Sequence, residues 1–232
     1  MASRARKPRR EVPLEKRTSY RRLLSALDEP GCPVCHVAGH AAKRYIASLL
    51  WESVTDVGTR RRLRAAHGFC RRHAIMAARV AADKAQATGM AIIYGDLLSH
   101  LAEEARGLVE ARRKDRDVAP EAVCPACEVA AMFVEGALGL LADAEEGSSL
   151  SAAARQEGRF LCLPHLRTGL RLADDERQTE CLVGLFAPVA DGIGDHLSKF
   201  VRKHGYEAHD ETISPEERAA WINAIQLLVG DL

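Results

Sequence analysis

Apolar residues recur along the chain at intervals of three and four, the spacing that places them on one face of an α-helix. The clearest stripe consists of Ala38, Ala41, Ala42, Tyr45, Ile46 and Leu49. The same stripe recurs 92 residues later as Ala130, Phe133, Val134, Ala137, Leu138 and Leu141. No stretch shows the sustained alternation of apolar and polar residues that a half-buried strand requires. The pattern predicts an all-α protein with an internal duplication.

Further helices are predicted on both sides of these stripes. A short helix is expected around residues 19–27, and two more are expected near 70–87 and 90–114. The last of these has Ile93, Leu97, Leu101, Ala105 and Leu108 on one side. The corresponding long helix of the second half carries Leu182, Leu185, Phe186, Val189, Ile193, Leu197 and Val201.

A last helix is predicted after residue 214. Ser214 is a suitable N-cap, Pro215 suits the first helical position, and Glu217 can close a capping box with Ser214. Its expected apolar face is Ala220, Trp221, Ala224, Ile225 and Leu228. We expect this helix to pack across both repeats.

Cysteine and histidine residues recur with the same offset. The motif Cys-Pro-x-Cys, followed after 34 residues by Cys-x-x-His, occurs twice. The first set is Cys32, Cys35, Cys70 and His73, and the second is Cys124, Cys127, Cys162 and His165. Three thiolates and one imidazole are a common closed ligand set for structural Zn²⁺. We therefore predict two zinc ions per chain, one held by each set.

The residues around the ligands are typical of helix starts. Pro33 and Pro125 occupy positions that suit a first helical residue, and Cys70 and Cys162 precede helical patterns. The partial positive charge and free N–H groups of a helix N-terminus favour a thiolate. Each metal would then clasp a helical hairpin within its own repeat.

These features predict four segments. Residues 1–16 would be a disordered basic tail, 17–117 the first metal-binding repeat, 118–206 the second, and 207–232 a C-terminal capping helix. The chain has 232 residues and 47% apolar content, which suffices for a sizeable core without metal. Residues 1–116 carry 24 basic and 12 acidic side chains, and residues 117–232 carry 9 and 20, so a basic half precedes an acidic half.

Seven cysteines, an odd number, do not suit a complete disulfide framework. The N-terminus is basic without an apolar signal core, and no run of about 18 apolar residues occurs. We therefore expect a cytoplasmic protein without membrane contact, whose cysteines bind metal.

Two alternatives use the same features differently. An iron–sulfur cluster, in a redox protein, could use the same three thiols and imidazole. A nucleic-acid-associated protein could use the basic half, through the cluster Arg60, Arg61, Arg62, Arg64, Arg71 and Arg72 and the N-terminal tail. No aromatic residues interleave with these arginines for base stacking, so we favour a solvated face that pairs with the acidic half. Haem attachment through Cys32-Pro33-Val34-Cys35-His36 is disfavoured, because the second repeat has Glu128 in place of His36.

The remaining candidate side chains have simpler interpretations. Asp96 and His100, with Glu52 or Asp56, could form an acid/base cluster, although pairing along a helix surface explains their spacing. The other candidates are His67 beside the first ligand set, His36 and His40 on one helix face, Cys181 as a small buried residue, and Trp51 and Trp221 as core residues. No catalytic residue is predicted, and an enzyme is the less favoured interpretation.

Several segments carry a family resemblance. They are the two Cys-Pro-x-Cys elements, Leu49-Leu50-Trp51-Glu52, Gly68-Phe69-Cys70-x-x-His73, Ala91-Ile92-Ile93-Tyr94-x-Asp96-Leu97-Leu98 and the segment from Trp221 to Gly230. Together they resemble a family of uncharacterised bacterial and archaeal proteins with paired CPxC and (F/L)CxxH elements. The resemblance covers nearly the whole chain except the tail, and it implies no particular activity. We expect a non-enzymatic helical scaffold that presents a surface to a protein partner.

Overall fold

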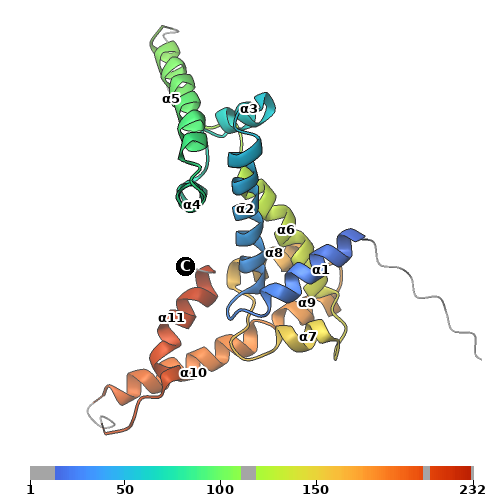
Figure 1. The fold of residues 1–232 in the computed structure, drawn as a ribbon. Helices are drawn as coiled ribbons and strands as arrows, with labels where there is room; N and C mark the ends of the chain where they lie inside the picture. Colours follow the sequence, from blue (N-terminus) through green and yellow to red (C-terminus); the bar gives the residue numbers. More distant parts are fainter. Residues whose placement is uncertain (1–13, 111–118, 206–209, 231–232) are drawn as a thin grey trace, which may run out of the picture. The chain divides into compact units, whose positions relative to one another are not determined.

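The computed structural model describes residues 14–110, 119–205 and 210–230. Within these ranges the structure contains eleven α-helices and no strand, which confirms the predicted all-α class (Figure 1). Residues 1–13 of the predicted basic tail lie outside the described residues. Residues 14–16 already belong to the first helix.

Three helices of the first half have counterparts at the same sequence offset in the second half. The first half contains α1 (Leu14–Ala26), α2 (Pro33–Glu52), α3 (Val57–Ala65), α4 (Arg71–Asp83) and α5 (Ala87–Glu110). The second half contains α6 (Pro125–Ala142), α7 (Ser149–Ala154), α8 (Leu163–Leu172), α9 (Glu176–Val183), α10 (Ala187–Lys203) and α11 (Pro215–Val229). Three pairs of helix starts differ by the offset of the cysteine motifs, since 125−33, 149−57 and 163−71 all equal 92. The duplicated sequence therefore specifies equivalent helix starts, while symmetry between the repeats stays a prediction.

The chain divides into two compact units whose boundaries differ from those of the predicted repeats. Unit 1 consists of residues 1–34 and 135–232, and unit 2 of residues 35–134. The division falls within α2 and again within α6, whereas the predicted boundary between repeats lies at residues 117 and 118.

Unit 2 has a continuous apolar core. Its buried residues are Ala42, Ile46, Leu49, Leu50, Leu63, Phe69, Ala77, Val80, Ala81, Ile93, Leu97, Cys124 and Ala126. The stripe predicted on α2 supplies several of these side chains. Trp51, however, lies on the opposite side of α2 from the buried Ala42 and Leu49 and is 76% exposed, so the prediction that it is a core residue is wrong.

In unit 1, α8 packs closely against α9 and α6 at Gly169. A Cβ added at Gly169 of α8 would lie 2.9 Å from a methyl carbon of Leu182 and 3.3 Å from one of Leu138. Both leucines are fully buried. The absence of a side chain at Gly169 therefore lets these helices approach.

The predicted long helix through Leu182 and Val201 is wrong in its continuity. The chain forms α9 and α10, separated at Gly184–Phe186, where α5 of the first half continues without a break. Pro188 in the first turn of α10 has no N–H to donate to an earlier turn, and this explains why a new helix begins there.

The C-terminal helix begins as the sequence predicts. Ser214 caps α11, Pro215 is its first residue, and Glu217 completes the capping box. The helix packs against α10 and α8 of unit 1 and buries Ala220 and Leu227. Trp221 is 51% exposed, so its assignment to the core is also wrong.

One described helix, α6, is long and apolar enough to cross a membrane by length and composition. The sequence offered no uninterrupted apolar run, because Glu128 and Glu135 lie within this helix. In the structure α6 contributes Ala126, Ala137, Leu138, Leu141 and Ala142 to the buried core. The core helices of soluble proteins have the same composition, so its apolar character agrees with a packing role.

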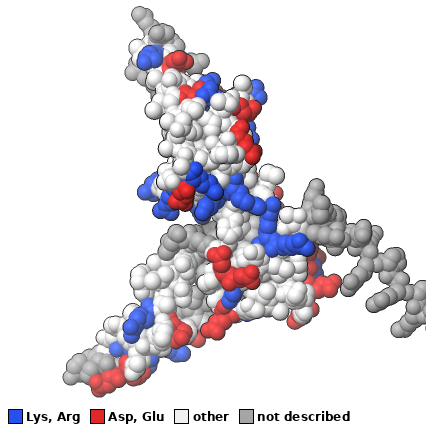
Figure 2. All heavy atoms as spheres, in the orientation of Figure 1, with Lys and Arg blue, Asp and Glu red and all other residues white. Residues whose placement is uncertain are grey.

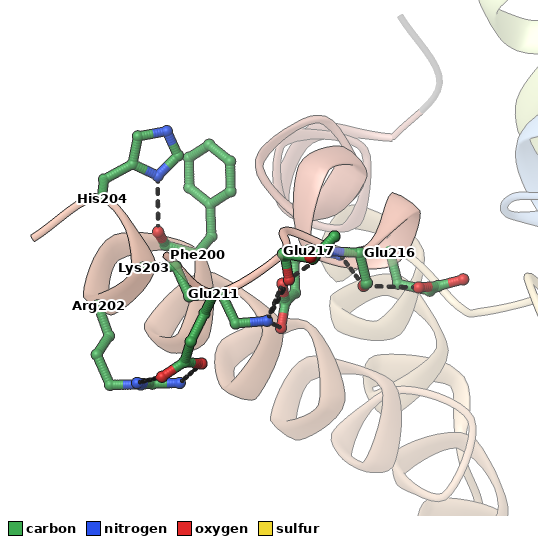
Figure 3. Close-up of polar contacts among 9 residues, drawn as sticks. Phe200, Arg202, Lys203, His204, Glu211, Glu216 and Glu217 are labelled. Carbon is green, nitrogen blue, oxygen red and sulfur yellow. Dashed lines mark hydrogen bonds and ion pairs between the residues drawn. The ribbon is translucent and has the colours of Figure 1, made fainter. Parts of the chain in front are cut away.

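A buried ion pair joins α10 to α11 (Figure 3). Lys203 Nζ lies 2.8 Å from both carboxylate oxygens of Glu217, and it also donates to the carbonyl oxygen of Thr212. The hydrogen bond from Lys203, with that from the Ser214 N–H, lowers the pKa of Glu217 below its ordinary value of 4.5. The neighbouring pair Arg202–Glu211 is half exposed on both sides.

We predict that Lys203→Met destabilises the protein markedly, because it leaves the buried Glu217 carboxylate without its cation. Arg202→Met is the matched control, and it should change the unfolding midpoint little, since exposed ion pairs contribute little. Thermal unfolding followed by circular dichroism measures both. Equal midpoints for the two variants would contradict the assigned role of Lys203.

The same pair predicts a dependence on pH. Because the folded-state pKa of Glu217 is depressed, its stabilising contribution is present above pH 4.5 and is lost as the pH falls through the folded-state value. The difference in midpoint between wild type and Lys203→Met should therefore shrink below pH 4.5.

Candidate metal centres

The eight predicted ligands lie in two groups of four, and in each group the ligand atoms are within 4.8 Å of one another. Group A consists of Cys32, Cys35, Cys162 and His165. Group B consists of Cys70, His73, Cys124 and Cys127. Each group therefore has the predicted composition of three cysteines and one histidine.

The partition of the ligands differs from the prediction. Each group combines the Cys-Pro-x-Cys pair of one sequence repeat with the Cys-x-x-His pair of the other. The expected sets, Cys32 and Cys35 with Cys70 and His73, and Cys124 and Cys127 with Cys162 and His165, do not form. The predicted clasp on a helical hairpin within each repeat is therefore wrong.

Helix lengths explain why a repeat does not close on itself. The helix α2 has 20 residues and Cys35 is its third, so the helix carries the chain about 25 Å away from Cys35. The following helix, α3, has 9 residues and spans about 14 Å, which is too short to lead the chain back to the start of α2. The second half has the same relation, with 18 residues in α6 and 6 in α7.

Backbone hydrogen bonds hold the exchanged segments together. In unit 1, the Gly31 N–H donates to the Gly158 carbonyl oxygen at 2.7 Å, and the Phe160 N–H donates to the Gly31 carbonyl oxygen at 3.2 Å. Both glycines have positive φ, 104° and 77°, a conformation that other residues rarely adopt. In unit 2, the Ala122 N–H donates to the Ala65 carbonyl oxygen at 3.0 Å. In each unit, these contacts place the segment that precedes a Cys-Pro-x-Cys motif beside the segment that precedes the Cys-x-x-His motif of the other repeat.

Four helix N-termini meet the ligands, as predicted. Pro33 and Pro125 are the first residues of α2 and α6. Cys70 and Cys162 are the N-caps of α4 and α8, both with extended backbone. His73 and His165 follow in the first turn of those helices. Each ligand pair is thus fixed by a rigid helix start, which limits the positions its sulfur and nitrogen atoms can take.

Group B has the dimensions of one tetrahedral ion. His73 Nδ1 lies 3.4 Å, 3.6 Å and 3.3 Å from the sulfur atoms of Cys70, Cys124 and Cys127. The sulfur atoms of Cys70 and Cys127 are 3.7 Å apart. A tetrahedron with Zn–S of about 2.3 Å and Zn–N of about 2.0 Å has S···N edges of about 3.5 Å and S···S edges of about 3.8 Å. The observed separations agree with these edges.

Group A is similarly tight. His165 Nδ1 lies 3.1 Å from the sulfur of Cys162 and 3.5 Å from that of Cys32. Both cysteines are fully buried. The same ring nitrogen, Nδ1, is therefore directed at the thiols in both groups.

The electrostatics of group B indicate a need for a cation. Burial opposes ionisation of Cys70, but the His73 N–H and the neighbouring thiols Cys127 and Cys124 outweigh it and lower the Cys70 pKa. Burial, hydrogen bonding with Cys70 and nearby negative charge raise the pKa of Cys127. Burial, followed by the charge of Arg72, lowers the pKa of His73, so the imidazole is neutral and able to ligate. Several thiolates can coexist here only when a positive ion balances their repulsion.

The two groups differ in exposure. All three cysteines of group A are buried. Of the three cysteines in group B only Cys124 is buried. Cys127 is half-buried, and Cys70 is exposed as a residue, although its side chain is partly shielded within the group. Equivalent ligand sets therefore have unequal access to solvent.

Basic side chains gather around α4 (Figure 2). Arg71 and Arg72 are exposed and directly follow Cys70 in the chain, so their positive charge belongs to the surroundings of group B. In the predicted set of Cys32, Cys35, Cys70 and His73, the same arginines would lie beside Cys32 and Cys35 as well. The altered partition of the ligands changes that assignment as well.

Three other arginines of the cluster, Arg60, Arg62 and Arg64, are paired with carboxylates. Arg64 donates to both oxygens of Asp96, Arg60 lies 3.8 Å from the same side chain, and Arg62 donates to Glu128 at 3.2 Å. The sequence predicts a solvated face that pairs with the acidic half. Of these pairs, only that of Arg62 with Glu128 joins the two halves in this way, whereas both pairs of Asp96 lie within the basic half.

The remaining candidates have structural roles. Asp56 caps α3 through the Thr59 N–H, and His67 lies 3.4 Å from Glu104. The Cys181 thiol donates to the Leu141 carbonyl oxygen and is half-buried. The proposed acid/base cluster around Asp96 is explained by its pairing with the arginines of α3.

Comparisons with known proteins agree with the whole-chain resemblance. A similar protein is the uncharacterized 23.9 kDa protein in the xynA 3′ region of Caldicellulosiruptor sp. (strain Rt8B.4), which is 24% identical over 208 residues. The match covers 90% of this chain and 99% of that protein. No solved structure matches. The model of a family of unknown function, DUF6062, matches residues 25–231, and the chain therefore belongs to that family.

Proposed function

We propose that the protein is a helical scaffold built on two structural zinc ions, one in group A and one in group B. The observation that carries the proposal is the size of the groups. All ligand atoms of a group lie within 4.8 Å of one another, as the four ligands of a single tetrahedral ion must. Three thiolates and one imidazole complete the preferred coordination of Zn²⁺ without an open position for a substrate.

The tight spacing favours one metal ion over an iron–sulfur cluster. A cluster distributes its protein ligands over two or more iron atoms, so ligands on different irons lie farther apart than ligands on one ion. In group B, the contacts of His73 with all three sulfur atoms lie between 3.3 and 3.6 Å. These contacts support a single mononuclear centre.

A scaffold is supported by where the ligands lie. Each group joins the starts of two helices, so the energy of metal binding contributes directly to holding the helices together. Trp51 and Trp221 expose large aromatic surfaces, which are enriched where proteins contact one another. We propose a protein as the partner and the cytoplasm as the location.

We predict that protein purified without oxygen contains two zinc ions per chain and absorbs no visible light. Elemental analysis and an ultraviolet–visible spectrum measure both quantities. Removal of the metal with a chelator should also lower the helical circular dichroism signal, because metal binding and folding are coupled. Iron with inorganic sulfide and a brown colour would contradict the zinc proposal and identify an iron–sulfur protein instead.

Paired substitutions test the partition of the ligands. Cys32→Ser with Cys162→Ser alters group A alone, so this double variant should retain about one metal ion per chain. Cys32→Ser with Cys70→Ser alters both groups and should retain close to none. Metal content measured under identical reducing conditions distinguishes the two double variants.

The predicted result reverses if each sequence repeat closes its own site. In that case Cys32→Ser with Cys70→Ser would spare one ion, and Cys32→Ser with Cys162→Ser would lose both. Cys181→Ser is the control for removal of a cysteine outside both groups, and it should leave the metal content unchanged.

A further inference from the structure

We propose that group B is a site of oxidative modification by hydroperoxides, at which Cys70 and Cys127 form a disulfide and metal is released while group A keeps its metal. This inference rests on the proposed function, because it concerns a centre loaded with metal. It goes beyond a structural role, since it assigns different chemistry to two groups with the same ligands.

The first observation is the access of solvent to Cys70. Oxidation of a cysteine requires thiolate character and exposure. Cys70 is exposed at the start of α4, whereas all three cysteines of group A are buried. A small polar oxidant in solution can therefore reach a sulfur atom in group B more readily than one in group A.

The second observation is a partner thiol within reach. The sulfur of Cys127 lies 3.7 Å from that of Cys70, and Cys127 is half-buried. A disulfide needs an S–S distance of about 2.0 Å, so the two sulfur atoms must approach by less than 2 Å. Each lies in or beside the first turn of a helix, where a change of side-chain rotamer supplies much of that movement.

The third observation is the charge beside Cys70. Arg71 and Arg72 follow it directly, and both are exposed. Their positive charge at the start of α4 can stabilise the negative charge that develops on an oxygen departing from a peroxide at Cys70. In group A the corresponding positions after Cys162 are Leu163 and Pro164, which carry no charge.

The chemistry balances in two steps. The Cys70 thiolate attacks one peroxide oxygen, the O–O bond breaks, and a proton from solvent converts the departing oxygen to an alcohol or water. Sulfur is oxidised by two electrons and becomes a sulfenic acid. The Cys127 thiolate then attacks that sulfur, the S–S bond forms, and the S–O bond breaks to release hydroxide, which solvent protonates to water.

The result is the loss of two of the four ligands. His73 and Cys124 remain, and two ligands do not complete the closed tetrahedral set of a structural site. The starts of α4 and α6 are then joined by a disulfide in place of the metal. Reduction by a dithiol restores both thiolates, so the modification is reversible.

The test is hydrogen peroxide treatment of the full-length zinc-loaded protein, with released zinc measured by a chromogenic chelator. We expect one equivalent in a fast phase and the second at least about tenfold more slowly. Peptide mass spectrometry after the fast phase should find a disulfide between Cys70 and Cys127. Release of both equivalents at one rate, or a different disulfide, would overturn the proposal.

Cys70→His is the matched variant, because it keeps four ligands but removes the exposed sulfur. It should hold two zinc ions and lose the fast phase. A fast phase that persists in this variant would exclude Cys70 as the oxidised residue. Should the variant bind less metal, the disulfide mapped in wild type still decides the proposal.

The metal content before treatment separates the two hypotheses. Fewer than two equivalents in reduced wild-type protein contradict the proposed function itself. Two equivalents that resist peroxide equally contradict only the oxidation of group B.

Discussion

The structure depends on the convergence of three thiols and one imidazole at the starts of two helices in each group. Such an arrangement is unfavourable without a cation, because thiolates 3.7 Å apart repel one another in partly buried surroundings. The opposite pKa shifts of Cys70 and Cys127 show the conflict, since one thiol ionises more easily and the other resists. A bound dication would neutralise the repulsion between the thiolates, and the N–H groups at the helix N-termini would stabilise the thiolates further. In the proposed scaffold the metal would therefore be part of the fold.

Each group combines motifs from both repeats because a long helix separates the two motifs of one repeat in space. Cys35 lies in the first turn of α2, and about 25 Å of helix follows before the chain can turn. The short α3 cannot reverse that distance, so Cys70 and His73 meet the other repeat's cysteines. The hydrogen bonds of Gly31 with Gly158 and Phe160 fix one of these meetings. The two ligand pairs are about 130 residues apart in the sequence in group A and about 55 apart in group B, and such long-range links oppose local unfolding.

Much of the fold and all eight candidate ligands could be predicted from the sequence, because helix periodicity, N-caps and ligand spacing are local signals. The capping box of Ser214 and Glu217 and the helix starts at Pro33 and Pro125 are examples. The partition of the ligands between the two groups depends on long-range contacts and is not encoded by a local signal. Two identical motifs are compatible with pairing within a repeat and equally with pairing between repeats. The lengths of the helices between Cys35 and Cys70 determine which ligands can meet. Apolar periodicity did not reveal these lengths, because α3 is strongly basic and shows little apolar stripe. The prediction for Trp51 was wrong for a related reason. A tryptophan side chain is typical of a core, but the position of Trp51 on α2 faces away from the core.

Duplication gave the two groups the same ligands but not the same surroundings, and the surroundings determine reactivity. A buried thiolate that ligates metal is protected from solvent oxidants, so group A is suited to a permanent structural role. Group B keeps Cys70 at the surface beside Arg71 and Arg72, although a purely structural centre gains nothing from exposure. The exposed sulfur and its flanking charges are confined to one group, which is the asymmetry expected when one copy of a duplicated site keeps its structural role and the other becomes reactive. Burial of the ligands, which the repeated spacing does not encode, is therefore the property that separates the two centres.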